Sequence, residues 1–216
     1  MCGTSHVPRE GLWMIKIKTF CLQQRLNFHR ILLNIDARKD NSRQTIDINM
    51  FKSSINNKTG DVMSVALGKP IPYFEIPATS GLVFTPTACQ GRKVVMYFYP
   101  KDSTPGCTVE SMEFRDAIDD FTKANALIVG ISRDNLKSHE NFKRKIELPF
   151  ELLADTEETL CQMFGVMKMK NMYGKQVRGI ERSTFLIDEE GVLRHEWRGL
   201  KIPGHVQDVL KAAIDL

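Results

Sequence analysis

The sequence predicts one α/β domain over residues 63–216, with a central mixed sheet flanked by helices. Three short runs, at 94–99, 126–131 and 183–187, are apolar and rich in β-formers throughout, as strands buried on both faces are. Segments with helical spacing of apolar residues lie between and after these runs. This alternation of strands and helices is typical of α/β proteins, and 216 residues leave room for one such domain and an appendage.

Two hairpins are expected to complete the sheet. Residues 72–78 and 82–86 flank Ser80-Gly81 and predict a short hairpin at the start of the domain. Near the end, Asp188 to Gly191 form a turn that leads from the last buried run into a strand at 192–198. The three buried runs are therefore predicted at the sheet centre, with an antiparallel pair at one edge.

Helices are expected in the intervening segments. After the first buried run, apolar residues recur at helical spacing, and charged residues occupy the opposite face. The predicted core-facing residues are Val109, Met112, Ala117, Ile118 and Phe121, and the predicted water-facing residues are Glu110, Arg115, Asp116 and Asp119. Further helices are predicted at 135–146, 157–164 and 204–214.

Residues 1–62 differ from the rest and are interpreted as an N-terminal extension. They hold ten Lys and Arg against five Asp and Glu, show no sustained periodicity, and end where Met63 begins the α/β pattern. The favoured interpretation is a start-site artefact with Met63 as the true start. A transit peptide is the second, because residues 14–35 could form a basic amphipathic helix. A disordered tail is the third.

Charge and motif content argue against several classes of function. The positive excess belongs to residues 1–62, whereas the main body is nearly neutral, which argues against nucleic-acid binding. The longest apolar runs are about a strand long, so no membrane span is expected. No dinucleotide or phosphate-loop motif is present, and His139, His195 and His205 lack metal-ligand spacing. We expect no cofactor and no metal.

The cysteines suit a reducing compartment. Their number is odd and no CxxC pair occurs, which argues against a disulfide framework and against a thioredoxin-type disulfide reductase. Without an export signal, the cytoplasm is the default location. The five are Cys2, Cys21, Cys89, Cys107 and Cys161.

Cys107 lies where a reactive thiol is expected. The buried run at 94–99 ends, the chain turns, and Thr104 and Pro105 fit the N-cap and first position of a helix. Cys107 then falls in the first turn, where unpaired backbone N–H groups and the positive helix end favour thiolate. A thiol with its pKa lowered to about 6 is roughly nine-tenths ionised at neutral pH.

The pattern Pro100-x-x-x-Thr104-x-x-Cys107 resembles the active-site motif of the peroxiredoxins. The longer segments 97–108, 170–174, 179–188 and 203–205 resemble the peroxiredoxin Q subfamily, also called bacterioferritin comigratory protein. The similarity covers about 66–214 and implies a thioredoxin-like fold with an N-terminal hairpin.

The resemblance implies a thiol-dependent peroxidase that acts on hydrogen peroxide or alkyl hydroperoxides. Cys107 would attack the peroxide and become a sulfenic acid. Thr104 and Arg182 would hold the peroxide oxygens, Pro100 would shield the sulfur, and Glu110 would orient Arg182. We expect a monomer or weak dimer.

The usual second cysteine of the subfamily is missing. Its two positions correspond to Met112 and Lys143, which predicts a one-cysteine enzyme reduced by an external thiol: thioredoxin, glutaredoxin or glutathione. Cys161 is expected to be buried and structural, whereas Cys89 is expected to be more accessible. A disulfide from Cys107 to either is the minority mechanism.

A peroxide sensor is the alternative function. In that case Cys107 would oxidise once and the modified protein would bind a partner without turnover. Consumption of many equivalents of peroxide per chain distinguishes the enzyme from the sensor.

Overall fold

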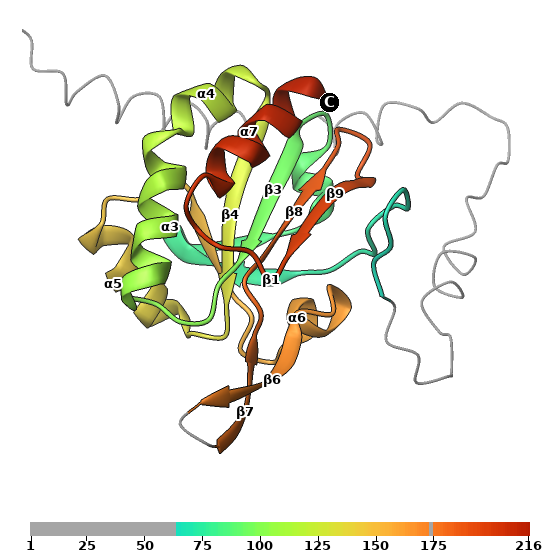
Figure 1. The fold of residues 1–216 in the computed structure, drawn as a ribbon. Coiled ribbons are helices and arrows are strands. Elements are labelled where there is room, and N and C mark those ends of the chain that lie inside the picture. Colours follow the sequence, from blue (N-terminus) through green and yellow to red (C-terminus); the bar gives the residue numbers. More distant parts are fainter. Residues whose placement is uncertain (1–63, 173–174) are drawn as a thin grey trace, which may run out of the picture. The chain divides into compact units, whose positions relative to one another are not determined.

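A seven-stranded mixed sheet forms the centre of the structure, a computed structural model that describes residues 64–172 and 175–216 (Figure 1). The strand order is β2-β1-β5-β4-β3-β8-β9. The strands are β1 (Ile76–Ala78), β2 (Leu82–Phe84), β3 (Lys93–Phe98), β4 (Ala126–Ser132), β5 (Glu151–Ala154), β8 (Ser183–Ile187) and β9 (Leu193–Arg198). β3, β4 and β5 are parallel, and the other pairings are antiparallel. The interpretations of residues 1–62 lie outside the described residues.

Two hydrophobic cores cover opposite faces of this sheet. Alternate residues of a strand point to opposite faces, and in β3 Val95 and Tyr97 join one core while Met96 and Phe98 join the other. Four helices pack on the first core, and the short α6 (Thr159–Met163) contributes to the second. The four are α3 (Pro105–Asp116), α4 (Ile118–Lys123), α5 (Leu136–Lys145) and α7 (His205–Asp215).

The predicted strands and hairpins are confirmed, but the first helix differs from its prediction. A break at Ala117 divides it into α3 and α4. Its core-facing side is also shifted, because Val109 is 48% exposed and Glu110 is fully buried. Cys107, Ser111 and Phe114 also face inward. The other predicted core-facing residues are confirmed, because they belong to the first core or pack against it: Met112, Ala117, Ile118 and Phe121. The inward face of α3 is thus partly polar, which is why apolar periodicity alone misplaces it.

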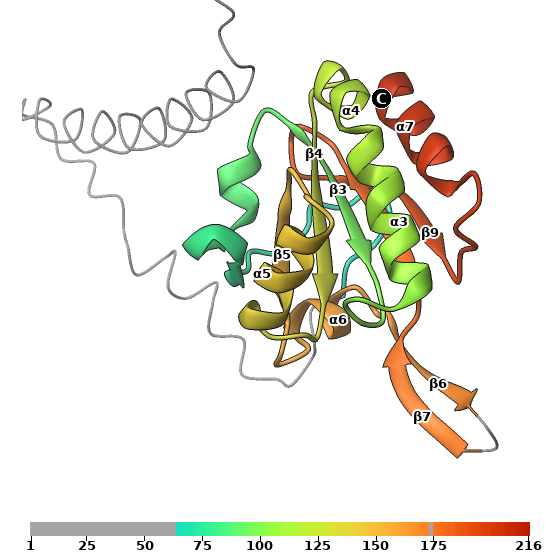
Figure 2. The ribbon, with the colours of Figure 1, turned by 90° about the vertical axis from the view of Figure 1, so that its left-hand side faces the viewer.

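Sequence periodicity also misses three strands. The four residues of β5 are Glu, Leu, Leu and Ala, which favour a helix as readily as a strand. β6 (Met167–Met172) and β7 (Lys175–Ile180) form an antiparallel hairpin that projects from the domain (Figure 2). Alternating methionine and polar residues in β6 are the period-two signal that would have predicted this strand.

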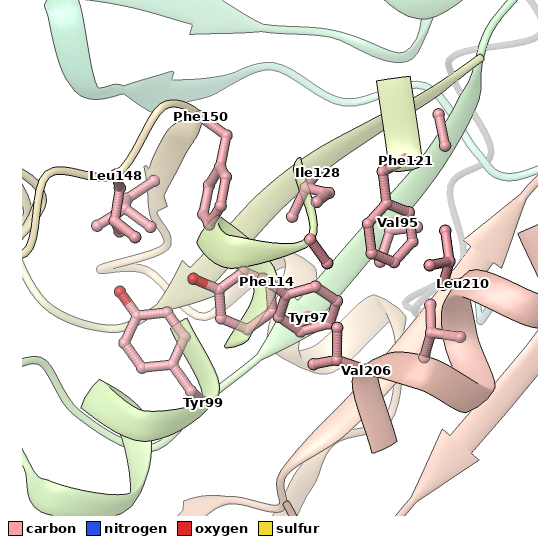
Figure 3. Packing of buried hydrophobic residues seen from close by; sticks show 14 of the residues in the cluster. Val95, Tyr97, Tyr99, Phe114, Phe121, Ile128, Leu148, Phe150, Val206 and Leu210 are labelled. Atoms are coloured by element: carbon pink, nitrogen blue, oxygen red, sulfur yellow. The ribbon is translucent and has the colours of Figure 1, made fainter. Parts of the chain in front are cut away.

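Tyr97 is packed tightly beneath α3 (Figure 3). Its ring lies 4.7 Å from that of Phe114, and its hydroxyl is 3.0 Å from Ser111 Oγ. The space for the ring depends on Gly130 in β4, where a Cβ atom would lie 2.6 Å from Tyr97 Oη and 2.7 Å from Leu152 Cδ2.

Gly130→Ala is therefore expected to destabilise the domain by about 1–3 kcal/mol through overpacking. Chemical denaturation measures the change. Gly179→Ala in β7 is the control, because no atom lies within 4 Å of the added Cβ. Its effect should stay within about 0.5 kcal/mol. Equal denaturation midpoints for the two variants would contradict the proposed crowding around Tyr97.

Candidate active site

Cys107 lies in the first turn of α3, directly after β3 and its turn. Pro105 occupies the start of the helix and Thr104 the N-cap, as predicted, but the Thr104 side chain does not cap. Its hydroxyl donates to the Lys101 carbonyl at 3.0 Å. The Thr104 carbonyl accepts the first helical bond, from Thr108 N–H at 2.9 Å. Cys107 is only 1% exposed, so its sulfur is largely shielded from bulk water.

Strand register brings Arg182 to Cys107. β3 pairs antiparallel with β8, and Phe98 at the end of β3 is the partner of Ser183 at the start of β8. Arg182, the residue before Ser183, therefore lies at the same end of these two strands as the turn that leads to Cys107. Arg182 Nη2 lies 3.4 Å from Cys107 Sγ, although the two residues are 75 positions apart. A cation at this distance stabilises a thiolate.

Glu110 holds the other side of the guanidinium. It follows Cys107 by one helical turn, and its Oε2 pairs with Arg182 Nη1. The Glu110 side chain is fully buried, whereas that of Arg182 is 15% exposed. Burial opposes the charge of Arg182, but Glu110 and Cys107 raise its pKa above the ordinary value. The structure thus brings Cys107, Arg182 and Glu110 together, whereas Thr104 is the N-cap of the same helix and Pro100 is half-buried in the turn before it.

Sequence reasoning misses a buried polar network at the loop between β3 and α3. The Asp102 carboxylate accepts hydrogen bonds from Tyr99 Oη and Ser138 Oγ, both at 2.7 Å, and lies 3.0 Å from His139 Nδ1. His139 Nε2 is 3.2 Å from the Leu153 carbonyl. Burial opposes ionisation of Asp102, yet the His139 contact and these hydroxyls lower its pKa. The network ties the loop before Cys107 to α5 and β5, and no local sequence pattern predicts it.

His205 packs on the Arg182 side of the same core. Its Nε2 is 2.8 Å from Thr184 Oγ1 in β8, and its ring contacts Trp197 and Phe114 edge-on. Burial lowers the pKa of His205 to about 4; Asp208 opposes this effect and Arg182 adds to it. His205 is therefore neutral near pH 7 and joins α7 to β8.

The other described cysteines lie on the opposite face of the sheet from Cys107. Cys89 and Cys161 belong to the second hydrophobic core, whereas Cys107 belongs to the first. Cys161 is buried as predicted, but the expected accessibility of Cys89 is wrong, because it is 5% exposed. Burial raises the pKa of Cys89 to about 11 and, with Asp155, raises that of Cys161 even further. Both thiols are protonated at neutral pH.

The two positions where the resemblance would place a second cysteine hold residues with structural contacts. Met112 is half-buried against the first core. Lys143 in α5 donates to Glu151 Oε2 at 2.6 Å and to Ser80 Oγ at 3.0 Å, so its amine fastens α5 to β5 and the first hairpin. Neither side chain supplies a thiol.

Comparison with known proteins shows the family to which the chain belongs. Residues 67–196 match the model of the AhpC/TSA family. The chain is 50% identical over 145 residues to Peroxiredoxin Bcp of Xanthomonas campestris, which covers 66% of this chain and 91% of that protein. The chain belongs to the AhpC/TSA family. It is a peroxiredoxin, and hence a thiol-dependent peroxidase.

Other peroxiredoxins are also similar to this chain in sequence and in structure. Peroxiredoxin Bcp of Bacillus subtilis is 44% identical over 71% of this chain and 98% of its own length. A solved structure of X. campestris peroxiredoxin Q superposes with a TM-score of 0.62 at 49% identity, covering 65% of this chain and 89% of that one. The predicted thioredoxin-like fold is thereby confirmed. Over residues 64–172 and 175–216, none of the helices has the length and apolar character needed to cross a membrane.

Proposed function

We propose that this peroxiredoxin reduces hydrogen peroxide and alkyl hydroperoxides through Cys107 in a one-cysteine cycle. The proposal rests chiefly on the 3.4 Å contact between Arg182 Nη2 and Cys107 Sγ, in which a cation lies beside a buried thiol. A solved relative that is 48% identical, the bacterioferritin comigratory protein of X. campestris, is described as having alkyl peroxide reduction activity, which supports organic hydroperoxides as substrates.

In the proposed oxidation, the Cys107 thiolate attacks the terminal peroxide oxygen. The S–O bond forms as the O–O bond breaks, giving a sulfenic acid and an alkoxide or hydroxide that takes up a proton. Negative charge moves from sulfur to the leaving oxygen. The Arg182 guanidinium has several N–H donors in a fixed plane, so it can contact both the sulfur and the oxygens.

Thr104 and Pro100 are proposed to complete the pocket. The Thr104 hydroxyl stands one turn before Cys107 and can exchange its bond to the Lys101 carbonyl for one to peroxide. Pro100 is half-buried at the end of β3 and would limit the access of water to the sulfur. Glu110 would hold the guanidinium in place through its ion pair.

An external thiol is proposed to reduce the sulfenic acid. The sheet separates Cys107 from Cys89 and Cys161, so an internal disulfide would require unfolding of the domain. Three free thiols in the described residues also suit a reducing cytoplasm. Thioredoxin, glutaredoxin and glutathione are candidate reductants.

Mass spectrometry after one equivalent of peroxide tests the one-cysteine cycle. We expect a sulfenic acid on Cys107 that becomes a mixed disulfide when glutathione is added. The Cys89→Ser and Cys161→Ser variants should give the same products, because neither thiol takes part. An internal disulfide from Cys107 to either residue in the wild-type protein would contradict the proposal.

A further inference from the structure

At the buried site, one cation contacts two acidic groups. The Arg182 guanidinium contacts Cys107 Sγ through Nη2 and Glu110 Oε2 through Nη1. The second carboxyl oxygen, Glu110 Oε1, is buried and has no hydrogen-bond partner among the described residues. If both the thiol and the carboxyl were ionised, the group would carry a net negative charge away from water.

Such a charge is costly, and a buried acid commonly avoids the cost by keeping its proton. Burial raises the pKa of Glu110 to about 7, even though the charge and hydrogen bond of Arg182 act in the opposite direction. A negative charge on the sulfur would further disfavour a charge on the carboxyl group, because both groups contact the same guanidinium.

We infer that Glu110 carries a proton while Cys107 is a thiolate and releases it when Cys107 is oxidised. This inference rests on the proposed function. It extends the role of Glu110 from orienting Arg182 to keeping the buried group electrically neutral in both redox states. Glu110 acts through Arg182 and is a positioning residue in this sense.

The protons and charges balance. Before oxidation the site holds a thiolate, a guanidinium and a neutral carboxyl group. The thiolate displaces alkoxide from the peroxide, and the sulfenic acid retains the peroxide hydrogen. The proton lost by Glu110 equals the proton gained by the leaving oxygen. Afterwards the site holds a neutral sulfenic acid and a carboxylate–guanidinium pair, so its net charge is zero at both stages.

The other titratable side chains near Glu110 and Arg182 do not supply a compensating positive charge. Glu113 in α3 is an acid that further raises the Glu110 pKa. Tyr97 from β3 is buried, and burial raises its pKa well above the ordinary value, so it stays neutral. His205 from α7 is neutral near pH 7. Arg182 is therefore the cation that balances the charge of Glu110 or of Cys107.

Infrared difference spectroscopy near pH 8, where a carboxyl group of pKa about 7 beside an uncharged sulfur is mostly ionised, tests the inference on the full chain. Oxidation by one equivalent of peroxide should remove a carboxylic-acid C=O stretching band and add carboxylate bands. Glu110→Gln should lack this change. Asp116→Asn, which removes an exposed carboxylate at the end of α3, should retain it. A reduced wild-type protein without a carboxylic-acid band that is lost on oxidation would overturn the inference.

Proton counting with an indicator dye gives a second measurement, and its decisive result comes from the wild-type protein. Wild-type protein at the same pH should take up almost no proton per peroxide consumed. Glu110→Gln should take up about one, because its thiolate must draw the proton from solvent. Uptake of about one proton by the wild type would overturn the inference while leaving the peroxidase intact. Failure to consume peroxide would instead refute the proposed function.

Discussion

Replacement of Cys107 by serine is expected to abolish peroxide turnover while leaving the fold intact. A serine hydroxyl does not ionise at neutral pH, so the nucleophile is lost and the rate should fall by more than about 10³-fold. The hydroxyl is close in size to the thiol, and it can accept the Arg182 N–H that now reaches the sulfur. The measurement is peroxide consumption with excess regenerating thiol.

Cys89→Ser provides the matched control. Cys89 is also buried but lies on the opposite face of the sheet, with its pKa raised to about 11 by burial. We expect this variant to keep the wild-type rate and to lose some stability, because a hydroxyl enters an apolar core. Turnover retained in Cys107→Ser would remove Cys107 as the nucleophile.

Arg182→Ala is expected to lower the second-order rate with peroxide by about 10²–10³-fold, as loss of a charge-stabilising donor does in other active sites. The variant removes the cation that we propose stabilises both the thiolate and the departing oxygen. The cost to stability should be much smaller, because Glu110 loses its ion pair but can remain neutral by keeping its proton. Stopped-flow kinetics and thermal unfolding measure the two effects.

Two further variants separate charge from geometry. Arg182→Lys keeps the positive charge but loses the planar fork that contacts sulfur and carboxylate together, so it should recover only part of the rate. Arg178→Ala removes an exposed arginine of β7 that pairs with Glu158, and it should leave the rate unchanged. Equal rates for Arg182→Ala and the wild type would refute the role of this residue.

Features that depend on near neighbours in the chain could be predicted. The buried strands, the hairpin at Ser80 and the start of α3 follow from short patterns of apolar and turn-forming residues. The position of Cys107 in the first helical turn follows in the same way. β5 was not predictable because four residues carry too little periodicity to separate strand from helix.

The sequence by itself predicted Cys107 as the nucleophile and determined the strand–turn–helix that presents it. Only the tertiary structure decided what surrounds the sulfur. The antiparallel register of β3 and β8 brings Arg182 to Cys107, and the packing of α3 buries Glu110 with it. The physical reason is that local conformation depends on adjacent residues, whereas burial and shared charge depend on segments that meet only after the sheet has formed.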